Sequence, residues 1–175
     1  MSIAKAMMVF ESFKSQCPDS EIMLQSPGMD ECDRDEFLNR YRQTSPRSLV
    51  GFAVMGGIFG EGIDLVGERL SGVVVVGVGL PGISLENELI KDYFTHSDNA
   101  GFEYAYQYPG INRVLQAAGR VIRTENDRGV VLLIDQRYAT HRYRSLFPVE
   151  WQPIRVQDQK QLAERLQKFW SQENR

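Results

Sequence analysis

Two kinds of apolar pattern alternate along the chain. Segments with an apolar residue every three or four positions predict amphipathic helices, and short apolar runs between glycine, proline or polar residues predict strands. The predicted helices are 4–13, 30–43, 84–94, 111–122, 137–146 and 158–172, and the predicted strands are 21–25, 48–55, 72–78 and 129–135. Strands that alternate with helices in this way predict an α/β fold with a mainly parallel sheet.

Local signals define several of these elements more closely. Asp30 and Ser84 are of the residue types that cap helix N-termini. The run 72–78 is continuously apolar and β-branched, which predicts a central parallel strand covered by helices on both faces. A helical stretch before the segment 111–122 is interrupted at Pro109-Gly110. The last helix, 158–172, is amphipathic, and we expect residues 171–175 to fray at its end.

Composition places the chain among globular proteins. It has 175 residues, of which 42% are hydrophobic and 25% charged, and this predicts one ordinary domain or a piece of a larger protein. The longest apolar run is far shorter than the roughly 20 residues of a membrane span, and the first residues lack a signal-peptide pattern. Cys17 and Cys32 form no metal-ligand pattern with the two histidines, so we predict no metal site. We therefore expect a cytoplasmic protein that does not enter a membrane.

Charge is distributed unevenly along the chain. The net charge of −3 and the pI near 5.5 argue against a nucleic-acid binder on whole-chain electrostatics. Between positions 111 and 144, however, seven arginines stand against three acids. Arginine suits the bidentate recognition of planar anions. The segment is therefore either an anion-binding surface or a solvated basic face.

The first segment that suits ligand binding follows the strand 48–55. In α/β sheets, ligands bind beyond the carboxyl ends of the strands. The segment 56–65 has four glycines among its first seven residues, and it also carries Glu61 and Asp64. Bare glycine backbone can approach a ligand closely. The alternative is a flexible connector whose glycines serve turns.

The second segment is 116–123, with the sequence QAAGRVIR. On a helix, Gln116, Arg120 and Arg123 fall at i, i+4 and i+7 and share one face. Gly119 permits the close approach of another backbone, and Ala117, Ala118, Val121 and Ile122 would form the buried side. Two arginines and a glutamine on one face can bind a phosphate. The alternative is again a solvated helix face.

These two segments resemble motifs of one enzyme family. QAAGRVIR resembles motif VI, QxxGRxxR, of superfamily 2 helicases, and GGIFGEGIDL resembles motif V of the same enzymes. Their order, and the gap of about fifty residues with a buried strand between them, also match. The strand that ends in DQRY and the later FPVEW are similar to the XPD/DinG group. The resemblance extends from about residue 30 to 151.

The resemblance implies a fold and a set of roles. The chain would be a RecA-like (P-loop NTPase type) three-layer sandwich, the second lobe of an ATP-dependent DNA helicase. Its partners would be ATP with Mg²⁺, single-stranded DNA and the N-terminal RecA-like lobe, which would supply most Mg²⁺ ligands. The implied site residues are catalytic Arg120 and Arg123, ATP-binding Gln116, Gly119 and Asp64, and DNA-binding Gly57, Gly60, Glu61 and Gly62.

Other features of these enzymes are missing from the sequence. It contains no GxxxxGK[ST] phosphate loop, no DEAH-like box and no cysteines that would hold an iron–sulfur cluster of that group. We therefore expect a C-terminal fragment, residues 1–175, that is inactive alone. The family's second lobe normally opens with an apolar strand, which is either a degenerate strand at 5–10 or absent here. The alternative functions are a non-hydrolysing nucleotide-binding domain and a protein-interaction module on a RecA-like remnant.

Overall fold

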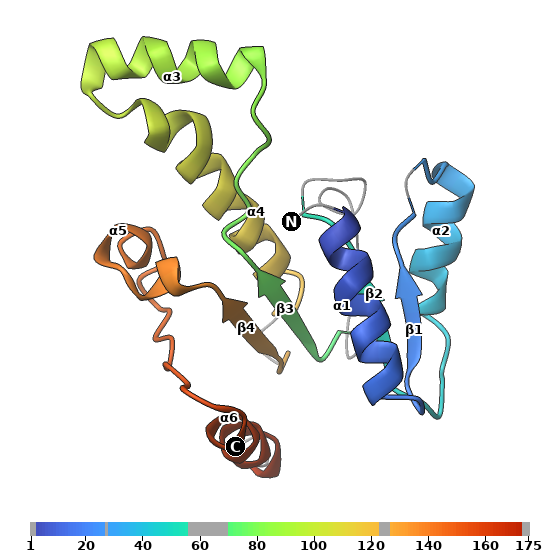
Figure 1. Cartoon of the computed structure of the whole chain (residues 1–175). Coiled ribbons are helices and arrows are strands. Elements are labelled where there is room, and N and C mark those ends of the chain that lie inside the picture. The colour runs from blue at the N-terminus through green and yellow to red at the C-terminus, as the bar shows by residue number, and fades with distance from the viewer. Residues whose placement is uncertain (1–2, 27, 56–69, 123–126, 173–175) are drawn as a thin grey trace.

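A computed structural model gives the fold of residues 3–26, 28–55, 70–122 and 127–172 (Figure 1). The strands are β1 (Glu21–Leu24), β2 (Leu49–Phe52), β3 (Gly72–Val76) and β4 (Val130–Ile134). The α-helices are α1 (Ile3–Gln16), α2 (Glu31–Arg40), α3 (Leu85–Asp98), α4 (Tyr108–Ala118), α5 (His141–Arg144) and α6 (Gln159–Ser171). A π-helix, η1 (Glu103–Gln107), precedes α4, and a 3-10 helix, η2 (Gln136–Ala139), precedes α5.

Capping side chains fix the starts of the predicted helices. Asp30 accepts a hydrogen bond from the backbone N–H of Asp33, whose side chain accepts one from the N–H of Asp30 in return. Ser84 caps α3, and Asp158 caps α6, each through the N–H three residues further on. These caps satisfy N–H groups that have no partner inside the helix.

The strands form two parallel pairs. β1 pairs with β2, with Glu21 opposite Leu49, and β3 pairs with β4, with Gly72 opposite Val130. The predicted parallel α/β organisation is thus confirmed. The suggestion that residues 5–10 form a degenerate strand is wrong, because they belong to α1.

Helices cover both faces of the β1–β2 pair. Phe52 packs edge-on against Phe10 and Phe13 of α1, with ring centroids 5.5 and 5.7 Å apart. Its neighbour Gly51 faces α2, where a Cβ would lie 3.1 Å from the ring of Phe37. Successive residues of a strand point to opposite faces, so α1 and α2 lie on opposite sides.

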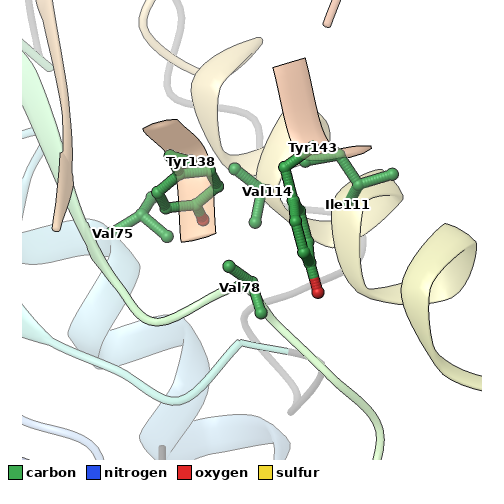
Figure 2. Close-up of a cluster of buried hydrophobic side chains, with 6 residues drawn as sticks. All are labelled: Val75, Val78, Ile111, Val114, Tyr138 and Tyr143. Carbon is green, nitrogen blue, oxygen red and sulfur yellow. The ribbon is translucent and has the colours of Figure 1, made fainter. Parts of the chain in front are cut away.

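The β3–β4 pair forms the main core with α4 and the segment after β4. Figure 2 shows the side chains of this core converging from β3 and the loop that follows it, from α4, and from η2 and α5. They are Val75, Val78, Ile111, Val114, Tyr138 and Tyr143. The expectation that both faces of β3 are covered is wrong for Val74, which is 59% exposed. Helix α4 packs on the face of Val75, and Val74 on the opposite face is exposed.

A cavity of about 710 Å³ separates the two strand pairs. Its walls include all residues of β2 and β3, together with Phe13 of α1 and Leu166 of α6. Among the described residues, β2 pairs only with β1 and β3 only with β4. One edge of each strand therefore faces this cavity without a strand partner from the described part of the chain.

The helical region before residue 118 differs from the prediction. α3 extends to Asp98, four residues beyond the predicted end, so it includes His96. The helix is not interrupted at Pro109-Gly110 but continues through it, by a change from η1 to α4.

Candidate nucleotide-binding site

Helix α4 carries the first part of the segment QAAGRVIR. Ile111, Val114 and Ala118 recur at helical spacing and are all at most 3% exposed. The helix ends at Ala118, and tighter turns follow, in which the N–H of Arg120 donates to the carbonyl oxygen of Ala117. The predicted helix end at Ile122 is thus four residues too late. Ile122 is 46% exposed, so it does not belong to the buried side as expected.

Gln116 and Arg120 nevertheless face the same space. Both line the cavity between the strand pairs, Gln116 as an exposed side chain and Arg120 as a half-buried one. Gly119, which lies between them, is exposed and adopts helical backbone angles at the helix end. The structure therefore brings together two of the predicted side chains, although Arg120 lies beyond the helix.

Arg113 is a third polar residue of this face. It lines the same cavity, and its Nη1 donates to the carbonyl oxygen of Gly79, 3.3 Å away, in the loop after β3. Arg113 is not among the site residues predicted from the sequence. It lies three residues before Gln116 and therefore on the same helix face. This spacing is the sequence signal that identifies Arg113 as a site residue.

The loop after β3 packs closely on the start of α4. A Cβ at Gly79 would lie 2.5 Å from the carbonyl oxygen of Gly110, and one at Gly110 would lie 2.7 Å from that of Val78. Gly79 also has a φ of +68°, which is unfavourable for other residues. Only glycine at both positions allows this contact, so the loop and α4 are held together at backbone distance.

The hydroxyl of Tyr138 secures the same loop from the other side. It donates to the carbonyl oxygen of Gly77, 2.7 Å away, and the tyrosine is 7% exposed. Burial, more than any neighbouring charge, raises the pKa of Tyr138 above its ordinary value. The tyrosine of the DQRY segment therefore has a structural role in the core.

The acid and the arginine of DQRY bind each other. Asp135 accepts from the N–H of Arg137, 2.9 Å away, and from its guanidinium, with an Nη2–Oδ2 distance of 2.8 Å. The side-chain hydrogen bond to Arg137 lowers the pKa of Asp135. The pair closes the turn that carries the chain from β4 into η2.

Several arginines of the arginine-rich segment 111–144 bind other groups of the protein. Four of the segment's seven arginines make hydrogen bonds to other groups in the described part of the protein: Arg113, Arg128, Arg137 and Arg142. Arg113 and Arg128 are half-buried, so the interpretation as a solvated basic face is wrong for these two, whereas Arg137 and Arg142 are exposed. The cluster is therefore only in part a surface for an external anion.

Several predicted site residues cannot be placed. Arg123 and the loop residues Gly57, Gly60, Glu61, Gly62 and Asp64 lie outside the described residues. Their roles stay predictions. Within the described ranges, no group of three or more His, Cys, Asp or Glu side chains is arranged to hold a metal ion. The residues of α4 offer cationic and amide donors, which fit the phosphates of a nucleotide by their chemistry.

Comparison with known proteins identifies the family. Residues 1–154 match the family described as Helicase C-terminal domain. The chain belongs to this family. No described helix of this helicase C-terminal domain is both long enough and apolar enough to span a membrane.

Curated relatives are named as helicases. The chain is 33% identical over 121 residues to a regulator of telomere elongation helicase 1 homolog of Caenorhabditis briggsae, covering 62% of this chain and 12% of the relative. It is 30% identical over 138 residues to a probable ATP-dependent helicase of Methanocaldococcus jannaschii, covering 74% and 20%. It is 36% identical over 120 residues to the ATP-dependent DNA helicase chl-1 of Caenorhabditis elegans, covering 67% and 14%. The chain thus spans a fifth or less of the length of these relatives.

A solved structure supports the fold. The structure described as XPD_APO matches with a TM-score of 0.55 and 19% identity, over 80% of this chain and 33% of that one. This likeness confirms the RecA-like α/β fold. Together with the relatives, it confirms that the helicase C-terminal domain is of the XPD/DinG type.

Proposed function

We propose that this helicase C-terminal domain is the second motor lobe of an ATP-dependent DNA helicase. It would contribute motif VI, and with it Gln116, Gly119, Arg120 and Arg123, to an ATP site shared with an N-terminal RecA-like lobe. The observation that carries the proposal is the common face of Gln116 and Arg120 toward one open cavity, in a chain of this family.

Arg120 and Arg123 would act on the phosphoryl group that is transferred. Charge builds up on that group in the transition state, and a fixed guanidinium stabilises it. Gln116 would place the nucleotide, and Asp64 of the motif V segment would contact its sugar or the motif VI arginines. Mg²⁺ would reach the site with ATP and neutralise its phosphates, held mostly by groups of the N-terminal lobe.

Single-stranded DNA would run along the motif V segment. Gly57, Gly60, Glu61 and Gly62 would line its path, where bare backbone amides can donate to phosphates. Closure of the two lobes on ATP and their reopening after hydrolysis would move the strand.

Alanine substitution of the two arginines in the full-length protein, followed by measurement of ATP hydrolysis, tests this proposal. Arg123→Ala should abolish DNA-stimulated ATP hydrolysis, by roughly 10³–10⁵ in rate as for other arginines of phosphoryl transfer, and leave ATP binding largely intact. Arg120→Ala should have a similar or somewhat smaller effect. Arg155→Ala, on the exposed segment before α6, is the matched control. If either variant of the motif keeps more than about a tenth of the rate, a loss of only ~1.4 kcal/mol, that arginine is not catalytic.

The isolated chain should not hydrolyse ATP. Its residues would supply half of a composite site, and its sequence has no lysine-bearing phosphate loop. Phosphate release from the purified chain with Mg²⁺ and single-stranded DNA measures this. Turnover of about one per second or faster, in the ordinary range of enzymes, would contradict the two-lobe mechanism.

A further inference from the structure

The helical turn before α4 contains one residue more than an α-helix allows. In η1, the N–H of Tyr108 donates to the carbonyl oxygen of Glu103, five residues back. The cause lies in the next residue, Pro109, whose ring would meet the carbonyl of Ala105 in a regular α-helix. The wider π-turn relieves this contact. Such turns are rare, and they occur frequently at functional sites.

The extra residue determines which way α4 faces. Each residue of an α-helix advances the direction of its side chain by about 100°. One inserted residue therefore rotates all of α4 by about that angle relative to the chain before it. With the π-turn in place, Arg113, Gln116 and Arg120 border the cavity. With a regular α-helix in its place, this face would turn away.

A buried glutamine and one arginine hold the π-turn. Gln107 is the last residue of η1 and is 1% exposed. Its Nε2 donates to the carbonyl oxygen of Arg142 over 3.1 Å, and its Oε1 accepts from Nε of Arg142 over 2.7 Å. Both polar atoms of a fully buried amide are thus satisfied by a single residue of α5.

The same arginine also binds the beginning of the π-turn. Nη2 of Arg142 forms an ion pair with Glu103, the first residue of η1. Its guanidinium carbon lies 5.1 Å from the ring centroid of Phe102, which directly precedes the π-turn. Arg142 therefore contacts both ends of the π-turn, and it fixes the inserted residue against α5.

We propose that Gln107 and Arg142 are positioning residues for motif VI. They lock the π-turn and thereby hold Gln116 and Arg120 in the orientation that ATP hydrolysis requires. Neither residue lines the cavity, so neither would touch the nucleotide. The inference rests on the proposed function, because it concerns the rate of the reaction that motif VI serves.

The test compares two variants in the full-length protein. Gln107→Leu removes both hydrogen bonds while keeping a side chain of similar size. Arg142→Lys keeps a cation for Glu103 but removes the Nε–H that donates to Oε1 of Gln107. We expect each to lower kcat for DNA-stimulated ATP hydrolysis about tenfold and to change KM for ATP by less than about twofold. The double variant should be no worse than the stronger single one, because both break one network.

Two control variants distinguish failure of the positioning role from failure of the proposed function. Asp30→Ala also removes hydrogen bonds, but at the start of α2 beside the β1–β2 pair, and it should lower Tm while leaving kcat unchanged. If the Gln107 and Arg142 variants lower Tm and keep kcat, the pair only stabilises the fold and the positioning role is wrong. Arg120→Ala in the same assay reports on motif VI itself. If that variant also keeps its rate, the proposed function fails, and not the positioning role alone.

Discussion

At the scale of single residues, Tyr138 connects the core to the loop after β3. Its hydroxyl bonds the carbonyl of Gly77, and Tyr138→Phe leaves that carbonyl without this donor. We expect the free energy of unfolding to fall by about 1 kcal/mol at pH 7, the usual net value of such a hydrogen bond. Urea unfolding followed by circular dichroism measures the change. An unchanged midpoint would mean that water replaces the hydroxyl at no cost.

The same substitution should also change the response to alkaline pH. Burial raises the pKa of Tyr138 in the folded chain, while in the unfolded chain it titrates near pH 10. The stability that this group contributes is therefore fully present below pH 10 and is lost as the pH rises above it. The unfolding free energy of the wild type should fall above pH 10 more steeply than that of the Phe variant.

At the scale of elements, one arginine fastens the last helix. Arg128, just before β4, donates to the carbonyl oxygens of Phe169 and Gln172 at the end of α6, and its guanidinium carbon lies 4.9 Å from the ring centroid of Phe169. A cation is favourable there, because the last carbonyls of a helix carry partial negative charge. The docking of α6 thus depends on a residue more than forty positions away in the sequence.

Arg128→Ala should therefore loosen the end of α6. We expect amide hydrogen exchange of residues 169–172 to accelerate about fivefold, which corresponds to a local loss of about 1 kcal/mol. Arg165→Ala, an exposed arginine of the same helix, is the control and should change exchange little. Equal exchange in the two variants would show that the apolar face of α6 alone holds it.

The elements that sequence patterns predict well are those with local signals. α2, α3 and α6 begin where Asp30, Ser84 and Asp158 provide caps, and β3 and β4 follow from apolar runs. Each of these signals lies within a few residues of the structure that it determines. The family motifs are equally local, which is why they could be located in the sequence.

The features that sequence patterns missed depend on distant partners. The sequence showed Pro109 as an interruption, but the helix continues because η1 is held by Arg142, 35 positions after Gln107. The exposure of Val74 depends on which elements cover the sheet, and an apolar run contains no information about that. The hydrogen bond from Arg113 to the carbonyl of Gly79 likewise joins residues 34 positions apart and forms only in the folded chain.

At the scale of the whole molecule, DNA binding by this chain alone should be weak. The net charge is −3, and several arginines of the basic segment already bind groups of the protein. Attraction must therefore come from a few local contacts to phosphates. We expect affinity for single-stranded DNA to fall with salt, with a log–log slope of about −0.7 per phosphate neutralised, and to depend little on base sequence.

Titration of a labelled oligonucleotide at several salt concentrations measures this slope. Two oligonucleotides of different sequence but equal length provide the control. Binding that is insensitive to salt and selective for one sequence would indicate readout of bases, and so a different kind of DNA-binding domain.

The cavity between β2 and β3 also affects how the protein unfolds. No hydrogen-bonded ladder joins the two strand pairs within the described residues, and each pair has its own helices and apolar contacts. Cooperative unfolding requires that the loss of one part removes contacts from the next. We therefore expect these two halves to unfold as separate cooperative units. Local melting of β1, β2 and their helices would leave the half that carries Gln116 and Arg120 folded.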